Sequence, residues 1–387
     1  MNEVYFHKRK VFIMKKVRFA IIGQGRSGRD IHGQYFRCTA NTQYEVAVVI
    51  DKDEFRRERA LKEYPGCEAF ADYKVLYDRK DIDIVVNASY SEMHYPISKD
   101  LLEHGLNVLV EKPMGKTYYE CLDLIKTAKD NGVMIAAFQQ TFVNPFHLGI
   151  KEIIASGKIG TPLQYSIQFN GFARRWDWQT VQVKAAGGIY NTGPHPIGLA
   201  LDYLEFDENI EVAFSKLALG LTSGDSDDYA KVILTAPGKA VVDVEISSMD
   251  AFPEPYVVKV MGTRGTLSAT RAGYKLKYVV DGENPEKPVI LESLEDENKN
   301  PAYCSEKLVT HEEEDNWKVE SNLDTTSHTK REENVLDKFD PATKNFYDGF
   351  YESLVNGAPL AVTPEMSAKV IGVIEAVHSQ NPLPVRF

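Results

Sequence analysis

The chain has 387 residues, of which 43% are hydrophobic and 26% charged, and its formal net charge is −11. This length exceeds one ordinary domain and the composition is that of a globular protein, so we expect two domains. The negative charge argues against nucleic acid or an anionic membrane surface as a partner. No apolar run reaches the roughly 20 residues that cross a bilayer.

The cysteines are far apart in the sequence and form no CxxC pair. This spacing is typical of neither a zinc site nor a disulfide framework, so we expect no bound metal and a reducing, cytoplasmic location. Residues 1–14 lack an apolar stretch of signal-peptide length. We interpret them as an extension before the first strand, with Met14 as an alternative start.

Residues 15–140 alternate short apolar runs with helical patterns. We expect strands at 17–22, 46–50, 84–86, 108–110 and 134–137. Helical patterns lie between them, at 53–64, 92–104 and 118–131. Such alternation predicts an α/β domain with a doubly wound parallel sheet, the Rossmann arrangement.

The first strand leads into the turn Gly23-Gln24-Gly25-Arg26-Ser27-Gly28. Glycines at this spacing let the backbone approach a pyrophosphate at the start of the next helix, so the turn predicts a dinucleotide site that includes Arg26 and Ser27. Asp51 ends the second strand, where a carboxylate binds ribose hydroxyls and favours NAD. Arg56 and Arg57 follow closely and keep NADP as the alternative cofactor.

Residues 141–362 predict an α+β domain with a large, mostly antiparallel sheet. Alternating segments on either side of Pro237-Gly238 predict a β-hairpin. We expect one face of the sheet to be open, which favours a homodimer or homotetramer. Residues 281–340 hold 18 acidic and seven basic residues, and we interpret them as a solvated insertion. The last helix, in 363–387, is expected to pack back on the Rossmann domain.

Several separated motifs resemble one family. The segment 101–113 (LLEHGLNVLVEKP) ends a strand with Glu111-Lys112-Pro113, and Gly187-Gly188-x-x-Asn191-x-x-x-His195 lies far downstream. Together with the turn at 262–267 and the closing helices, these motifs resemble the Gfo/Idh/MocA family of NAD(P)-dependent oxidoreductases. The resemblance runs from about residue 15 to the end of the chain.

The resemblance implies a hydride transfer at a secondary hydroxyl group. It assigns the proton acceptor to His195 and the donor that steadies the substrate oxygen to Lys112, which fits the chemistry of both side chains. Asn191 stands where the family usually has aspartate. An amide orients a hydroxyl or an imidazole but supplies no negative charge and accepts no proton.

Further site residues are expected at strand ends and in one loop. The predicted cofactor contacts outside the glycine turn are Asp51, Asn87, His94, Glu111, Lys112 and Gln140. The predicted substrate contacts are Lys112, Arg174, Trp176, Asn191 and His195. The cluster at 174–178 combines guanidinium groups with indoles, which suits a sugar ring or, equally, a subunit interface.

Three functions remain open from the sequence. The first is an NAD(P)-dependent dehydrogenase acting on a sugar, a sugar derivative or a cyclitol. The second is a glycosidase that oxidises its substrate transiently, eliminates a substituent and returns the hydride, for which the missing aspartate is one reason. The third is a non-catalytic sensor that binds dinucleotide or sugar, although the presence of both Lys112 and His195 argues for catalysis.

Overall fold

The computed structural model describes residues 16–287, 294–303, 305–318 and 339–383. The predicted extension at 1–14 and much of the acidic insertion lie outside these ranges. The chain forms two compact units. Of the described residues, unit 1 comprises 16–111, 124–138 and 339–361, and unit 2 comprises 112–123, 139–287, 294–303, 305–318 and 362–383.

Unit 1 contains a parallel sheet with the strand order β3-β2-β1-β4-β5-β6. The strands are β1 (Val17–Ile22), β2 (Tyr44–Ile50), β3 (Glu68–Phe70), β4 (Ile84–Asn87), β5 (Val108–Glu111) and β6 (Ile135–Phe138). Every residue of β4, β5 and β6 is buried, as expected of strands covered on both faces. The predicted Rossmann sheet is confirmed, and β3 is an additional short edge strand.

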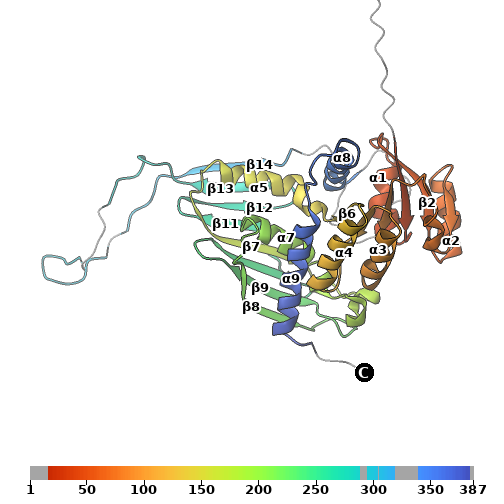
Figure 1. The fold of residues 1–387 in the computed structure, drawn as a ribbon. Coiled ribbons are helices and arrows are strands. Elements are labelled where there is room, and N and C mark those ends of the chain that lie inside the picture. The colour runs from red at the N-terminus through yellow and green to blue at the C-terminus, as the bar shows by residue number, and fades with distance from the viewer. Residues whose placement is uncertain (1–15, 288–293, 304, 319–338, 384–387) are drawn as a thin grey trace, which may run out of the picture. The chain divides into compact units, whose positions relative to one another are not determined.

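The helices of unit 1 follow the expected alternation. They are α1 (Gly33–Arg37), α2 (Glu54–Glu63), α3 (His94–Glu103) and α4 (Tyr118–Asp130), whose first turns belong to unit 2. A fifth helix, α8 (Pro341–Asn356), comes from near the end of the chain and lies beside α1 (Figure 1). The sequence assigned α8 to the second domain, whereas its contacts place it in unit 1.

Aromatic side chains explain why α8 belongs to unit 1. The ring of Tyr347 on α8 stacks on that of Tyr35, with centroids 5.1 Å apart, and meets the edges of Phe19 and Tyr44. Tyr347 is completely buried, and its backbone oxygen accepts a hydrogen bond of 2.5 Å from the Tyr44 hydroxyl. Such a cluster buries a large apolar area and fixes ring geometry, so it attaches α8 firmly to the Rossmann sheet.

Unit 2 contains an eight-stranded sheet with the order β14-β13-β12-β11-β7-β10-β9-β8. The strands are β7 (Pro162–Asn170), β8 (Glu211–Ala218), β9 (Tyr229–Thr235), β10 (Val241–Ser247), β11 (Val258–Gly262), β12 (Gly265–Ala269), β13 (Gly273–Tyr278) and β14 (His311–Asn316). The predicted hairpin pairs β9 with β10 antiparallel, and the only parallel pair among these strands joins β7 to β10. The mostly antiparallel sheet is therefore confirmed.

Helices cover one face of this sheet (Figure 1). They are α5 (Pro145–Ala155), the single turn α6 (Gly188–Asn191), α7 (Pro194–Tyr203) and α9 (Pro364–Gln380). Burial alternates along β9 and β10, as expected when one face of a sheet packs on helices and the other is polar. The C-terminal helix α9 packs on α7 and β8 within unit 2, which differs from the sequence assignment of 363–387 to the Rossmann domain.

One part of the acidic insertion has a regular structure. The run Glu312-Glu313-Glu314-Asp315 lies in β14, an edge strand paired with β13. Opposite charges stabilise this pairing, since Lys277 Nζ lies 2.6 Å from Glu312 Oε1 and Lys158 Nζ lies 2.7 Å from Glu313 Oε1. The sequence indicated only a solvated insertion because acidic residues are uncommon in strands. Across the described residues, no helix is long and apolar enough to cross a membrane.

Replacing Tyr347 tests the attachment of α8. We expect Tyr347→Ala to lower the free energy of unfolding by about 3–5 kcal/mol, because it leaves a cavity among buried rings. Tyr347→Phe keeps the ring and loses only the hydroxyl, which accepts or donates a 2.6 Å hydrogen bond with His32 Nδ1, and should cost about 1–3 kcal/mol. Urea unfolding measures both values. The exposed Tyr119→Ala serves as the control, and an equal effect there would contradict the interpretation.

Candidate functional site

The glycine turn of unit 1 follows β1 directly. Gly23 has a φ of +91°, and a Cβ added there would lie 2.4 Å from the backbone oxygen of Ala88. A Cβ on Gly28 would lie 1.9 Å from the backbone oxygen of Gly23. Both positions therefore require glycine for the fold itself. At Gly25 the nearest atom to an added Cβ is Arg56 Nη1 at 3.8 Å, so that glycine is not needed for packing.

A π-helical segment, η1 (Arg26–His32), continues from the turn into α1. Gly25 precedes η1 with extended backbone, and no side chain caps this helix start. Backbone N–H groups at a helix start that lack a side-chain acceptor suit an anion such as a pyrophosphate. Arg26 and Ser27 lie in the first turn of η1, where the sequence predicted cofactor contacts.

Glu111 is buried and interacts with the end of η1. Its Oε1 lies 3.1 Å from Nε2 of His32, and Nδ1 of His32 lies 2.6 Å from the Tyr347 hydroxyl. His32 is itself fully buried. Glu111 therefore helps to fix η1 relative to β5, and its direct contact with a cofactor stays a prediction.

Asp51 lies beside the glycine turn at the end of β2. Its Oδ2 accepts a 2.7 Å hydrogen bond from the backbone N–H of Gln24, and its Oδ1 accepts one of 2.9 Å from that of Asp53. Arg57 Nη1 donates to the backbone oxygens of Asp51 and Lys52, at 2.8 and 2.9 Å. The carboxylate is thus held in a fixed orientation, whereas the Arg57 guanidinium is engaged by the backbone.

Asn87 and His94 connect the end of β4 to the start of α3. Asn87 Nδ2 donates to the backbone oxygen of His94 at 3.1 Å and to Ser98 Oγ at 3.0 Å. His94 Nε2 lies 3.3 Å from the backbone oxygen of Ser89. Both side chains are buried. These contacts shape the loop after β4, and the predicted contacts of the two residues with a cofactor stay predictions.

In unit 2, Lys112 contacts the second glycine-rich element, residues 187–195. Lys112 Nζ donates a 2.9 Å hydrogen bond to the backbone oxygen of Asn191. The Asn191 side chain is oriented separately, because its Oδ1 accepts a 3.0 Å hydrogen bond from Gln179 Nε2. The peptide bond between Lys112 and Pro113 is cis. Two motifs nearly 80 residues apart are therefore in direct contact.

His195 lies at the start of α7 and contacts a residue that the sequence did not indicate. Its Nδ1 lies 2.5 Å from Thr141 Oγ1. Thr141 belongs to η4 (Gln140–Val143), the short helix after β6. Gln139 Nε2 donates to the backbone oxygen of Pro194 at 2.5 Å, which joins the same two segments. The polar residues that follow β6 thus orient His195.

Gln140 and the loop at 174–178 are more weakly connected to these residues. Gln140 Oε1 is buried and has no hydrogen-bond partner in the part of the chain that the structure describes. The Arg174 guanidinium lies 5.7 Å from the ring centroid of Trp176, and the indole of Trp176 is 77% exposed. The loop continues to Gln179, which contacts Asn191.

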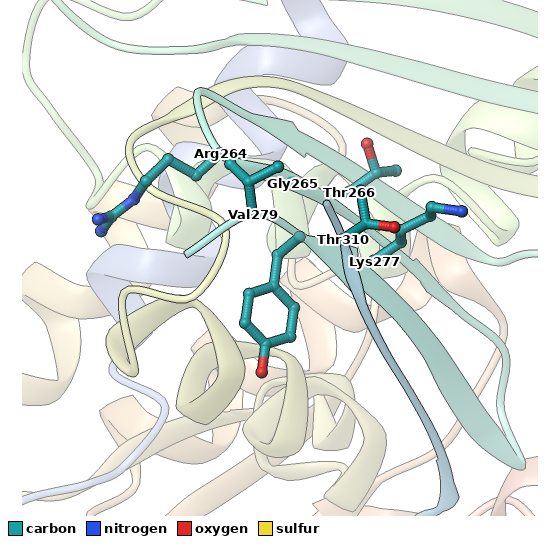
Figure 2. Close-up of a pocket in the computed structure, with 7 residues that line it drawn as sticks. Arg264, Gly265, Thr266, Lys277, Val279 and Thr310 are labelled. Carbon is teal, nitrogen blue, oxygen red and sulfur yellow. The ribbon is translucent and has the colours of Figure 1, made fainter. Parts of the chain in front are cut away.

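A surface hollow elsewhere in unit 2 contains none of the predicted site residues. It lies between β12, β13 and Thr310, as Figure 2 shows, and is lined by Arg264, Gly265, Thr266, Lys277, Tyr278, Val279 and Thr310. Its two cations already have carboxylate partners, because Arg264 pairs with Asp281 and Lys277 pairs with Glu312. We assign no chemistry to it.

Sequence reasoning missed Asp227, which contacts the second glycine-rich element. Its Oδ2 accepts a 2.8 Å hydrogen bond from the backbone N–H of Ile189, in α6. Burial raises the pKa of this carboxyl group to about 7. The only sequence signal is a pair of acidic residues, Asp227-Asp228, directly before β9, and such a pair is common at the start of a strand.

The sheet order of unit 1, the glycine turn and the carboxylate after β2 define the class of an NAD-binding Rossmann protein. Residues 17–139 match the family described as "Oxidoreductase family, NAD-binding Rossmann fold". Residues 147–268 match the "GFO/IDH/MocA C-terminal domain". The chain belongs to the Gfo/Idh/MocA oxidoreductase family.

Some of the similar proteins have sugar-related names, and others are named only as oxidoreductases or NAD-binding proteins. A 2,7-anhydro-N-acetylneuraminate hydratase of Mediterraneibacter gnavus is 26% identical over 75% of this chain and 77% of its own length. A scyllo-inositol 2-dehydrogenase (NADP(+)) of Bacillus subtilis is 21% identical over 94% of both chains. An NAD-binding protein from Listeria innocua has the same fold, with a TM-score of 0.73 and 20% identity over 95% of this chain and 98% of its own.

The different surroundings of the three glycines allow a test of the turn. We expect Gly25→Ala to fold normally, because its Cβ has room, and to bind NAD at least about tenfold more weakly, because the methyl group obstructs a pyrophosphate. Calorimetric titration with NAD and a thermal unfolding curve measure the two effects. Gly23→Ala, whose Cβ would meet Ala88, should instead lower thermal stability. Unchanged NAD affinity in Gly25→Ala would show that the turn is not the pyrophosphate site.

Proposed function

We propose that this protein is an NAD-linked oxidoreductase that transfers a hydride between nicotinamide and a secondary alcohol carbon of a sugar, a sugar derivative or a cyclitol. The observation that carries the proposal is the 2.9 Å hydrogen bond from Lys112 Nζ to the backbone oxygen of Asn191. It joins a lysine to the element that holds His195, so a donor for the substrate oxygen and an acceptor for its proton lie in one unit.

The residues of the first glycine turn fit NAD. Gly25 leaves room for a phosphate at the uncapped start of η1, and Asp51 offers a fixed carboxylate for the ribose hydroxyls. Nicotinamide, when bound, supplies the hydride acceptor or donor that protein side chains lack. We assign the dinucleotide to Gly23, Gly25, Arg26, Ser27, Gly28 and Asp51, with Asn87, His94, Glu111, Lys112 and Gln140 as further contacts.

His195 would hold and release the hydroxyl proton. For Nε2 to accept that proton, the neutral ring must carry its hydrogen on Nδ1 and donate it to Thr141 Oγ1. In that tautomer the Thr141 hydroxyl accepts the hydrogen of Nδ1, and the contact holds the ring of His195 in a fixed orientation.

Lys112 and Asn191 would act on the substrate oxygen and on orientation. The ammonium of Lys112, positioned by the backbone oxygen of Asn191, would donate to the oxygen and favour its deprotonated form. The Asn191 amide, held by Gln179, would orient a hydroxyl group but not accept its proton. His195 is consequently the base in this proposal.

Two other features support a carbohydrate as the substrate. The exposed indole of Trp176 offers an apolar face for a sugar ring, and Arg174 beside it offers hydrogen-bond donors to hydroxyl groups. We also propose that the protein forms a homodimer or homotetramer through the open face of the unit 2 sheet. We further propose a cytoplasmic location, because the buried thiols of Cys67 and Cys121 suit a reducing compartment.

A second candidate reaction has specific support. The similarity to a hydratase of an anhydro sugar, together with asparagine at position 191, favours a reaction in which oxidation is transient and an elimination follows. Water would then add to the unsaturated intermediate and the hydride would return to the same substrate, so the net result would be hydrolysis of a glycosidic bond. His195 and Lys112 would keep the same roles in the oxidation step.

Cofactor choice is tested by comparing NAD with NADP. We expect NAD to bind more tightly, because the Asp51 carboxylate repels a 2′-phosphate while Arg57 is bound to backbone oxygens. Asp51→Asn keeps the acceptor for the Gln24 N–H but removes the charge, so it should narrow the difference in Kd. Arg57→Lys is the control and should leave the ratio of Kd values nearly unchanged. Tighter binding of NADP to the natural protein would reverse this assignment.

The reaction is tested with a panel of sugars, cyclitols and aryl glycosides, each with NAD and with NADP. Formation of reduced nicotinamide supports the dehydrogenase, whereas release of an aglycone without net reduction supports the second candidate. We expect His195→Ala to abolish turnover and Thr141→Val to lower kcat about tenfold, because Nδ1 of His195 loses the hydrogen-bond partner that orients the ring. Thr127→Val is the control, since Thr127 is equally exposed at 8%. Tight dinucleotide binding with no turnover would favour a sensor.

A further inference from the structure

The carboxyl group of Asp227 lies against the start of the second glycine-rich element. The Asp227 side chain is 2% exposed, and its Oδ2 accepts a 2.8 Å hydrogen bond from the N–H of Ile189. The Asp227 backbone oxygen accepts one of 2.7 Å from the N–H of Gly188. The neighbouring Ser226 Oγ donates to the backbone oxygen of Ala186 at 2.7 Å. Two consecutive residues before β9 therefore hold three consecutive peptide units of the element.

The glycines of the element are explained by this carboxyl group. Gly187 has a φ of +102°, and a Cβ added there would lie 2.3 Å from Asp227 Oδ1. A Cβ on Gly188 would lie 3.1 Å from Asp227 Oδ2. The carboxyl group thus occupies the space that side chains at these positions would fill. Asp227 and the two glycines therefore form one tightly packed cluster.

A short series of backbone hydrogen bonds leads from this cluster to the proposed catalytic residues. The N–H of Asn191 donates to the oxygen of Gly187 at 2.9 Å, and the N–H of Thr192 donates to that of Gly188 at 2.9 Å. The N–H of His195 donates in turn to the oxygen of Thr192 at 3.0 Å. A change at Asp227 therefore reaches Asn191 and His195 through about two turns of helix.

The charge of Asp227 is poorly compensated. Its Oδ1 is buried and has no hydrogen-bond partner among the described residues. Burial, and to a smaller extent the negative charge of Asp228, raise the pKa of Asp227, the N–H groups of Ile189 and Gly188 lower it, and the resulting pKa is about 7. Tyr190, on α6, also interacts electrostatically with Asp227, and the nearby Asp225 is bound to the N–H of Gln182. The carboxyl group thus changes its charge near neutral pH.

We propose that Asp227 is a positioning residue that holds residues 187–195 in place, and that its protonation state sets how firmly Asn191 and His195 are held. The part of this inference that concerns catalysis rests on the proposed function. The structural part concerns only how readily the element opens.

The direction of the pH effect follows from where the charge is least costly. When the element opens, Asp227 reaches water and its pKa returns toward the ordinary value of an aspartate. The closed form therefore binds a proton more tightly than the open form. Closure of residues 187–195 is most favourable at low pH. The free energy of closure becomes less favourable as the pH rises from the ordinary pKa of an aspartate to about 7, and it does not change further at higher pH.

Hydrogen exchange measured by mass spectrometry on the full-length protein tests the structural part. After correction for intrinsic exchange, we expect the protection of peptides covering residues 187–197 to fall between pH 5 and 7, by up to about tenfold per pH unit. Asp227→Asn keeps the acceptor for the Ile189 N–H but cannot ionise, so this pH dependence should disappear. Asp228→Asn is the matched control, since it removes the adjacent charge from a residue bound to the N–H groups of Gly220 and Thr222. It should keep the pH dependence with a lower midpoint.

The same variants test the catalytic part with a substrate found in the panel. We expect Asp227→Asn to remove a pH-dependent limb of kcat near neutral pH and to change the Kd for NAD only slightly, because most of the proposed dinucleotide contacts, including the glycine turn and Asp51, lie in unit 1. Exchange that depends on pH equally in wild type and Asp227→Asn would overturn the inference, and so would a kcat profile identical in the two proteins. If no substrate is turned over, the proposed function fails, while the exchange experiment still decides the role of Asp227.

Discussion

Both parts of the proposed site depend on glycines that leave no space for a side chain. At two of them the neighbouring atoms are backbone atoms, and at the third they belong to a carboxyl group. In unit 1, Gly23 and Gly28 allow the chain to fold over itself after β1. In unit 2, Gly187 makes room for Asp227 beneath α6. Side chains at these positions would move η1 in one case and the element carrying His195 in the other.

The sheet of unit 1 could be predicted because its strands are buried on both faces. Continuous apolar runs, each ending near glycine or a polar residue, gave the positions of β1, β2, β4, β5 and β6 to within two residues. The hairpin β9–β10 was equally clear, because alternation and a proline-glycine turn agree. By contrast, four of the six residues of β14 are acidic and pair with a strand that carries Lys275 and Lys277, and no local pattern contains that information.

Some residues of the proposed site lie in motifs that the sequence shows, and others have no such signal. Gly23, Lys112 and His195 lie in motifs with defined spacing, and the contact of Lys112 with the element of His195 agrees with the expectation that these motifs act together. Thr141 and Asp227 act through tertiary contacts with residues more than 35 positions away. A threonine after a strand and an aspartate before one have no sequence signature. Helix α8 was misplaced for the same reason, since its attachment depends on rings brought together by the fold.

Asparagine at position 191 separates two tasks that an aspartate would combine. Lys112 is bound by the backbone oxygen of residue 191, so its position does not depend on the side chain there. The Asn191 amide oxygen accepts from Gln179, as a carboxylate also would. What the substitution removes is a negative charge that stabilises a protonated histidine.

A net dehydrogenase must keep the proton on His195 until it reaches water, and the missing charge makes that step more costly. A reaction that oxidises, eliminates and then reduces the same substrate returns the proton within one cycle, and therefore depends less on a stable imidazolium. In the proposed function the contact between Lys112 and Asn191 would serve either reaction, and the absence of a charge at position 191 would matter more for a net dehydrogenase.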